Sequence, residues 1–304
     1  MSGRAAPLTA QRTGDNIPSA VGYMCLSIAL FPVLNASAKY LGPRYSMAEI
    51  VWARYFGHFI YMLILFMPGR GLRLFRTRRL FMQLVRSFLL LGSTVSFFIG
   101  LKGISLAMAS AINFIGPFIV TALSVPMLGE RVGPRRWSAV VVGFIGAIVI
   151  IRPGAGAVNG WALFIVGNAT FYAFYQIFSR RLAAIDPAET SITYAAMVGT
   201  VAATVLLPFD CRWPDNSWDW LAFLGLGLFG GLGHYFVVKA FENAPASVLS
   251  PFNYLQLVGA TIVGYLIFGD FPDAWTWIGA AVIVASGLYI TYREARLKKA
   301  GMAV

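Results

Sequence analysis

Two asparagines inside long apolar runs are the side chains best placed to contact a ligand. Asn113 and Asn253 lie 140 positions apart, and each has a proline close by, Pro117 and Pro251. A proline removes one helical hydrogen bond, which leaves a carbonyl oxygen free to accept a hydrogen bond from a ligand. The other possible role is an amide bond between helices, worth about 0.6 to 2 kcal/mol in a membrane. The sequence leaves both roles open.

Four cationic or titratable residues also lie within or near apolar runs. Arg54 and His58 are one helical turn apart, and an arginine inside a membrane costs about 2.5 kcal/mol or more. His234 is suited to carry a coupling proton, or it is a satisfied core residue. Lys39 either attracts a carboxylate at the mouth of a cavity, or extends its ammonium to the membrane interface.

The predicted substrate contacts combine amides, hydroxyls, aromatic rings and a few cationic or titratable groups. Such a wall suits an uncharged, zwitterionic or aromatic solute better than an inorganic ion, which requires a charged ring or many carbonyls. The residues are Asn35, Lys39, Phe97, Phe98, Ser110, Asn113, Phe171, Tyr175, Gln176, His234, Tyr235, Ser250, Asn253, Tyr254 and Gln256.

The composition places these residues in a membrane protein with several crossings. The chain has 304 residues, of which 58% are hydrophobic and only 12% charged, with a mean hydropathy of +0.71. Ten apolar runs predict ten transmembrane helices and an all-α fold embedded in the lipid bilayer. The runs lie at about 20–41, 46–67, 80–100, 105–128, 136–151, 160–179, 189–207, 219–240, 247–268 and 275–292.

The basic residues predict the orientation in the membrane. An even number of crossings puts both termini on one face. Of the 24 Lys and Arg residues, Arg54 and Arg86 fall inside runs, five fall on the face opposite the termini, and the other 17 on the face of the termini. Both termini are therefore predicted in the cytoplasm, with the chain in the inner (plasma) membrane. This pattern also explains the net charge of +12 without nucleic acid, and two cysteines suggest neither a disulfide framework nor a metal site.

A repeat with an offset of 140 positions divides the chain into two similar units. The offset pairs Gly129 with Gly269, Glu130 with Asp270 and Trp137 with Trp277. The first unit spans residues 19–152 and the second 158–292, between a cytoplasmic tail at 1–18 and a basic tail at 293–304. Each unit has five helices, so the second enters the bilayer from the opposite face. Inverted repeats can open one central cavity to either side in turn.

Two short patterns predict helix starts. Ser46-Met-Ala-Glu49 has the spacing of a capping box, in which the serine and glutamate side chains bond to each other's backbone amides. Asp186-Pro-Ala-Glu189 has the same spacing, with a proline at the first helical position. We expect both to begin helices.

The segments LGERVGPRRWSAVVVGFIGAIVI and FGDFPDAWTWIGAAVIVASGLYI resemble the two repeats of the EamA family in the drug/metabolite transporter superfamily. The resemblance covers about Val21 to Tyr292. It implies a basket of ten helices around a central cavity lined by the first, third, fourth, sixth, eighth and ninth. It also implies export of small metabolites, as in the YddG-type exporters of aromatic amino acids.

We therefore expect a secondary transporter that exports amino acids, aromatic or otherwise neutral, by alternating access and without a cofactor. Export of other small solutes or drugs is the alternative within the superfamily. A channel and a structural scaffold are further alternatives. An intramembrane lipid-modifying enzyme would need a gathered nucleophile and base or a set of metal ligands, and the sequence has only two histidines, on separate helices.

Overall fold

The structure, a computed structural model, consists of helices and their connections. It describes residues 16–129, 132–152, 160–182, 185–207, 211–243 and 249–299, and no β-strand occurs among them. The helices are α1 (Ile17–Leu41), α2 (Met47–Arg70), η1 (Gly71–Phe75), α3 (Leu80–Gly100), α4 (Leu106–Asn113), α5 (Gly116–Leu128), α6 (Pro134–Ile151), α7 (Gly160–Leu182), α8 (Ala188–Leu206), α9 (Ser217–Asn243), η3 (Ser250–Tyr254), α11 (Leu255–Phe268) and α12 (Ala274–Lys299). The predicted all-helical class is confirmed over these residues.

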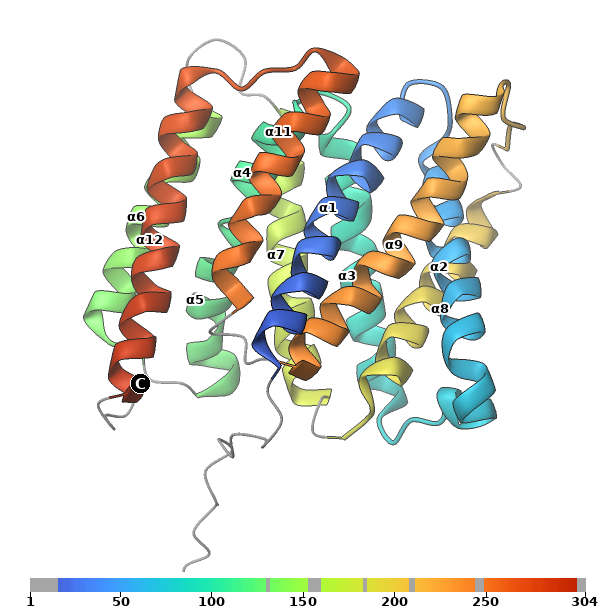
Figure 1. Cartoon of the computed structure of the whole chain (residues 1–304), viewed down its shortest axis with the longest axis horizontal. Coiled ribbons are helices and arrows are strands. Elements are labelled where there is room, and N and C mark those ends of the chain that lie inside the picture. The colour runs from blue at the N-terminus through green and yellow to red at the C-terminus, as the bar shows by residue number, and fades with distance from the viewer. Residues whose placement is uncertain are drawn as a thin grey trace, which may run out of the picture.

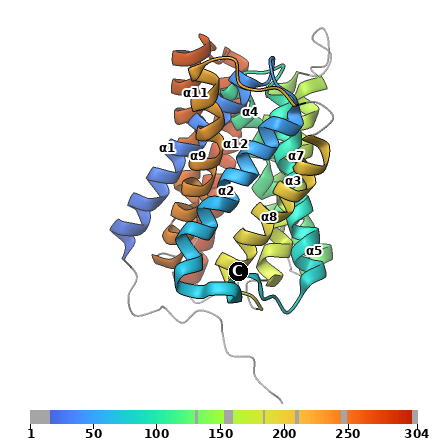
Figure 2. The ribbon, with the colours of Figure 1, turned by 90° about the vertical axis from the view of Figure 1, so that its right-hand side faces the viewer.

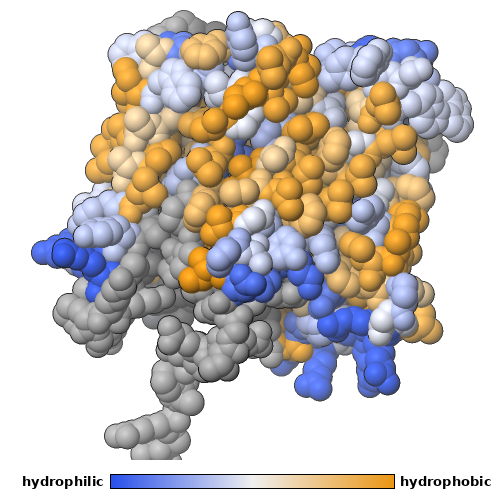
Figure 3. All heavy atoms as spheres, viewed as in Figure 1, coloured by the Kyte–Doolittle hydropathy of each residue, from blue (hydrophilic) through white to orange (hydrophobic). Residues whose placement is uncertain are grey.

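The bundle has the surface of a protein that lies in lipid. Six helical segments are long and apolar enough to cross a membrane, and three shorter apolar helices accompany them. Figure 3 shows apolar side chains over the middle of the bundle and strongly hydrophilic ones gathered at its lower edge. The chain is therefore a multi-pass membrane protein, and the count of ten crossings stays a prediction.

The two halves of the chain make equivalent helix contacts. α1 packs against α9, as its counterpart α7 packs against α3. α1 also packs against α11, as α7 packs against α4 and α5, and α6 packs against its own counterpart α12. The same unit therefore occurs twice, and each copy completes the other's packing.

The two copies run in opposite directions. In Figure 1, α5 ends at the lower edge of the bundle, whereas its counterpart α11 ends at the upper edge. Each ends at a glycine with positive φ, 68° at Gly129 and 70° at Gly269, a conformation that glycine adopts without strain. The start of α1 and the end of α12 both lie at the lower edge. Glu130, the predicted equivalent of Asp270, lies outside the described residues.

Both copies interrupt the helix that carries the predicted asparagine. α4 ends at Asn113, and α5 begins three residues later at Gly116. In the second copy Asn253 lies in the 3-10 helix η3, which leads directly into α11. Irregular backbone within a membrane is tolerated where protein or a water-filled cavity surrounds it. The two breaks are therefore consistent with an interior position for both asparagines.

One of the two predicted capping boxes forms. The Ser46 hydroxyl accepts from the Glu49 amide at 3.3 Å, and the Glu49 carboxylate accepts from the Ser46 amide at 2.8 Å. At the second pattern a helix begins as predicted, since α8 starts at Ala188, but the capping box is wrong, because the N-cap is Pro187 and there is no side-chain capping bond. The Asp186 carboxylate points instead to the start of α3.

Asp186 holds the connection between η1 and α3. It accepts hydrogen bonds from the Thr77 hydroxyl, the Arg78 amide and the Gln83 side chain, the last at 2.9 Å. Burial alone raises the pKa of Asp186, but these three hydrogen bonds outweigh burial and bring the pKa below its usual value. The contact joins the first repeat to the connection between α7 and α8.

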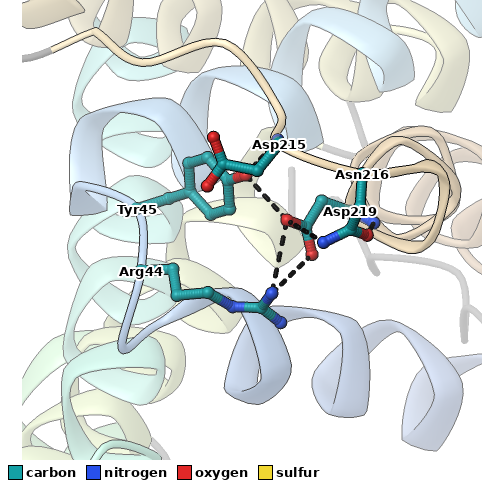
Figure 4. A network of polar contacts seen from close by, with 5 residues as sticks. All are labelled: Arg44, Tyr45, Asp215, Asn216 and Asp219. Carbon is teal, nitrogen blue, oxygen red and sulfur yellow. Dashed lines mark hydrogen bonds and ion pairs between the residues drawn. The ribbon is translucent and has the colours of Figure 1, made fainter.

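A polar network joins the two repeats at the upper edge (Figure 4). The buried carboxylate of Asp219, near the start of α9, accepts from the Tyr45 hydroxyl at 2.8 Å and from Asn216 at 3.0 Å. Arg44 approaches the same carboxylate at 3.1 Å, and Tyr45 accepts from the amide of Asp215. Burial raises the pKa of Tyr45, so this phenol stays protonated and donates. The network positions the connection between α1 and α2 relative to α9.

The crossing of α2 and α9 depends on two glycines. The helices lie side by side in Figures 1 and 2, and a Cβ added at Gly57 would lie only 2.6 Å from the Cα of Gly227. Small residues allow such close approach of helix backbones in membranes. This contact sets how deeply α2 enters the bundle.

We predict that Gly57→Ala lowers stability by about 1 to 3 kcal/mol, because the methyl group has no space at the crossing. The matched control is Gly22→Ala on α1, where an added Cβ meets nothing within 4 Å. The control should be neutral or slightly stabilising, since alanine favours a helix by up to about 1 kcal/mol over glycine. Thermal unfolding in detergent measures both, and equal effects would show that the crossing is not tightly packed.

We predict that Cys211 is labelled from outside intact cells by a membrane-impermeant maleimide in a Cys25→Ser background. Cys211 is exposed and lies in the connection between α8 and α9, at the edge opposite both termini. The control is Arg73→Cys in a background without other cysteines, because Arg73 is exposed in η1 at the lower edge. It should react only after lysis. The reverse labelling pattern would contradict the predicted cytoplasmic termini.

Candidate functional site

An arginine lies deep in the bundle without a polar partner. Arg54 lies on α2, about two turns after the capped start of that helix. Its guanidinium is 5.3 Å from the ring centroid of Phe98 and 5.7 Å from that of Tyr55. Over the described residues it makes neither a hydrogen bond nor an ion pair. Its contacts are with aromatic rings, which attract a cation without neutralising it.

Two stacked histidines lie next to Arg54 at the crossing of α2 and α9. The rings of His58 and His234 are 5.4 Å apart and almost parallel, at 4°. Phe31 of α1 meets His234 edge-on at 5.4 Å. The Nε2 atom of His58 is buried and has no hydrogen-bond partner among the described groups. The predicted contact residue His234 therefore belongs to a cluster with Arg54.

A second buried arginine is fully engaged. Arg86 of α3 donates to the Ser179 hydroxyl at 2.6 Å, to the Ser191 carbonyl at 2.7 Å and to the Tyr175 hydroxyl at 2.7 Å. These partners belong to α7 and α8, so the guanidinium ties three helices together. The predicted contact residue Tyr175 is thus a structural partner of Arg86 as well.

The same groups keep accessible surface inside the bundle. Arg54, Tyr172 and His234 lie among the packed helices, yet each keeps part of its surface accessible to solvent. Tyr172 also stacks on Tyr175, with centroids 5.3 Å apart, and interacts electrostatically with Arg54. This part of the interior is therefore aromatic and basic.

No described ion pair neutralises these basic groups. The Asp and Glu residues that the structure describes lie in connections or in the terminal parts of helices. The carboxylates in described ion pairs hold Lys39, Arg44, Arg70 and Arg152. Basic groups beside aromatic rings favour a solute that carries an anionic group and a ring.

A family model describes nearly the whole chain. The EamA-like transporter family matches residues 18–152 and again 159–292. The chain belongs to this family. The two matches give the EamA-like protein the two-repeat membrane fold that its helix contacts show, and they confirm the resemblance seen in its sequence.

Relatives of this EamA-like protein carry the names of transporters. The S-adenosylmethionine uptake transporter of Rickettsia felis is 32% identical over 90% of this chain and 92% of its own length. The riboflavin transporter of Rhizobium johnstonii is 28% identical over 91% and 92%. The pseudopaline exporter CntI of Pseudomonas aeruginosa is 28% identical over 90% and 95%. A crystal structure that is 20% identical has the same fold, with a TM-score of 0.64 over 92% of this chain and 99% of its own.

The predicted contact residues of the EamA-like protein fall into several groups. Phe98 and His234 lie in the cluster around Arg54, whereas Tyr175 contacts Arg86 and stacks on Tyr172. Phe97 and Ser110 are buried, and Tyr254 meets Phe114 edge-on at 5.1 Å, next to the broken helix. The partly buried residues without a described hydrogen bond of the side chain are Asn35, Gln176, Asn253 and Gln256. The side chain of Ser250 lies outside the described residues.

Asn113 makes the bond between helices that the sequence left open. Its side-chain amide lies 2.6 Å from that of Asn168 on α7, and Asn168 lies 2.6 Å from the Ser93 hydroxyl on α3. These three polar groups satisfy one another across three helices. Contact of Asn113 with a ligand stays a prediction.

Three predicted contact residues lie away from this cluster. Tyr235 neighbours His234 in sequence but faces Phe66 of α2 and Phe236, with centroids 6.3 and 5.7 Å away. Phe171 covers Gly92 at the contact of α3 with α7 and is 41% exposed. Lys39 lies at the upper end of α1, in an ion pair with Asp270.

A separate groove lies on the flank of the bundle. It has a volume of about 640 Å³ between α2, α9 and the connection from α8, and its lining includes Trp52, Phe56 and Trp220. None of the predicted contact residues lines this groove. Arg54 does not line it either.

Arg54, Arg86 and Tyr172 are not among the contact residues that the sequence predicts. The available signal was the presence of only two arginines inside apolar runs, because a charge in that position requires a partner or a function. The helix numbers implied by the resemblance pointed away from α2. The close approach at Gly57 explains why α2 reaches the interior nevertheless.

We predict that Lys39→Met lowers stability by about 1 to 2 kcal/mol, because the ion pair with Asp270 is partly buried. The ammonium also donates to the Ile104 carbonyl at 3.2 Å, so its loss releases the connection between α3 and α4 as well. The exposed pair of Arg152 with Asp273 is the control, and Arg152→Met should change stability by less than about 1 kcal/mol.

The exchange of both charges, Lys39→Asp with Asp270→Lys, should recover part of the lost stability in the same thermal unfolding assay. A double variant as unstable as the sum of the two single variants would show that the charge pair itself contributes nothing.

Proposed function

We propose that the protein is a secondary transporter that moves a small organic solute through the bundle by alternating access. The observation that carries the proposal is a pair of repeats of opposite direction that enclose Arg54, a cation with accessible surface and no ion pair or hydrogen bond among the described residues. Inverted repeats can exchange conformations, and such an exchange opens a shared site first to one face and then to the other. Membership of the EamA-like family and the names of the relatives support the same class.

The proposed cargo is an amino acid or a metabolite that contains an amino-acid group together with a ring. The aromatic side chains Phe98, Tyr172 and Tyr175 support a planar group. S-adenosylmethionine, named for the Rickettsia relative, combines an amino-acid group with an adenine ring. Riboflavin, named for the Rhizobium relative, has a planar ring system without an amino-acid group, so its exchange tests whether the ring alone is recognised.

The proposed direction is export from the cytoplasm across the inner membrane, with both termini in the cytoplasm. The relatives include a protein named for uptake and one named for export. This variety is expected physically, because alternating access is reversible, and the solute or coupling-ion gradient sets the direction.

We predict that purified protein in liposomes exchanges at least one member of a labelled panel: tryptophan, phenylalanine, S-adenosylmethionine and riboflavin. Liposomes loaded with the unlabelled solute should take up the labelled form faster than empty ones, with saturation at high concentration. A channel lacks this stimulation by solute on the opposite side. No exchange of any member would overturn the proposed cargo class.

A locked variant is the matched control. Lys39→Cys with Asp270→Cys, in a background without Cys25 and Cys211, allows a short thiol crosslinker to join α1 to the connection between α11 and α12. The crosslink should abolish exchange by holding the upper edge closed, and cleavage of the crosslinker should restore it. Undiminished exchange through the crosslinked protein would contradict alternating access.

A further inference from the structure

The charge of Arg54 has no structural role that the contacts within the bundle explain. A guanidinium has five N–H donors and stays protonated in proteins. In a membrane interior such a group is found paired, or it faces an aqueous cavity. Arg54 has no described ion pair or hydrogen bond, and it retains accessible surface deep in the bundle. Its donors are therefore available to a ligand.

Arg86 shows how the same chain satisfies an arginine that has a structural role. Each of its three nitrogens donates to a protein oxygen within 2.7 Å, and the residue is only 4% exposed. Those oxygens come from hydroxyls and a carbonyl, which leave the positive charge in place. Arg54 and Arg86 therefore bring two positive charges into the bundle, and no described helix carries a carboxylate in its middle.

The groups around Arg54 also define the shape of a complementary ligand. Phe98 and Tyr55 flank the guanidinium, and Tyr172 is close enough to interact with it electrostatically. His58 and His234 close the side toward α9. Arginine binds a carboxylate through two parallel N–H···O bonds, and the surrounding rings accommodate a planar apolar group.

We propose that Arg54 is the anchor for a carboxylate of the transported solute, and that the rings around it hold an aromatic or other planar part of the same molecule. The inference rests on the proposed function and deepens it, because it names the recognised group and the residue that recognises it. It makes Arg54 a residue that determines specificity. A solute with the same ring but without the acid group is a poor ligand.

The test uses benzoate and benzamide, which share a ring and differ in the acid group. Thermal unfolding of the full-length protein in detergent is measured with either compound at equal ionic strength, with acetate as the control for a carboxylate without a ring. We expect benzoate to raise Tm in a saturable manner, and acetate and benzamide to have much smaller effects. In Arg54→Gln the apparent benzoate affinity should fall at least about tenfold, or about 1.4 kcal/mol.

Two further variants separate ligand binding from folding. Arg54→Lys retains the charge without the bidentate geometry, so it should recover only part of the affinity. Arg73→Gln removes an exposed arginine from η1 and should leave the benzoate response unchanged. Without ligand, Arg54→Gln should unfold at a Tm equal to or above that of the wild type, because it removes an unpaired interior charge.

The inference is overturned if benzoate does not stabilise the wild-type protein, if acetate or benzamide matches it, or if Arg54→Gln responds like the wild type. A Tm of unliganded Arg54→Gln well below the wild type would likewise overturn it, since it would show a structural role. These outcomes are independent of the liposome exchange, which tests the transport function itself. Exchange that persists with an unchanged preference for tryptophan over tryptamine in Arg54→Gln would refute the anchor and leave the transporter intact.

Discussion

The structure depends on one constraint, that polar groups inside a lipid bilayer must find their partners within the protein. Hydrocarbon offers no hydrogen bonds, so each buried donor or charge must be paired or must face water. The chain meets this constraint by keeping its carboxylates near the ends of helices, by pairing Asn113 with Asn168, and by surrounding Arg86 with three oxygens. Arg54 and the Nε2 atom of His58 depart from the pattern, because neither has a hydrogen-bond partner among the described residues.

The inverted repeats explain why the two halves share one interior. Each repeat breaks one helix, at Asn113 in the first and at Asn253 in the second. The pairs of α1 with α9 and of α7 with α3 are equivalent, so the interior is bounded by the same helices from both copies. The side chains are not equivalent, because the offset that pairs Asn113 with Asn253 pairs Lys39 with Ser179. The two copies therefore share the arrangement of their helices and differ in the side chains at paired positions.

The upper edge illustrates this difference. Lys39 joins the end of α1 to Asp270, and its ammonium lies 4.9 Å from the ring of Phe268. At the lower edge the end of α7 contacts α5 through Arg181 and the Met127 carbonyl. An ion pair and a hydrogen bond to a carbonyl have different strengths, so the two edges of the bundle are held by contacts of different strength.

The sequence by itself determined the class, the duplication and the reversal of the second half. These properties follow from hydropathy, from the offset of 140 positions and from the basic loops. Each is visible in the sequence because insertion into a membrane depends on the local hydropathy and loop charge. It also identified the capping box at Ser46 and the unusual nature of Asn113. Only the tertiary structure decided which polar residues meet. The approach of Gly57 to Gly227 brings Arg54 and His58 of α2 into the interior, and local helix geometry sends Tyr235 away from His234. Such contacts depend on helix rotation and depth, which packing between distant segments sets and which no single helix encodes.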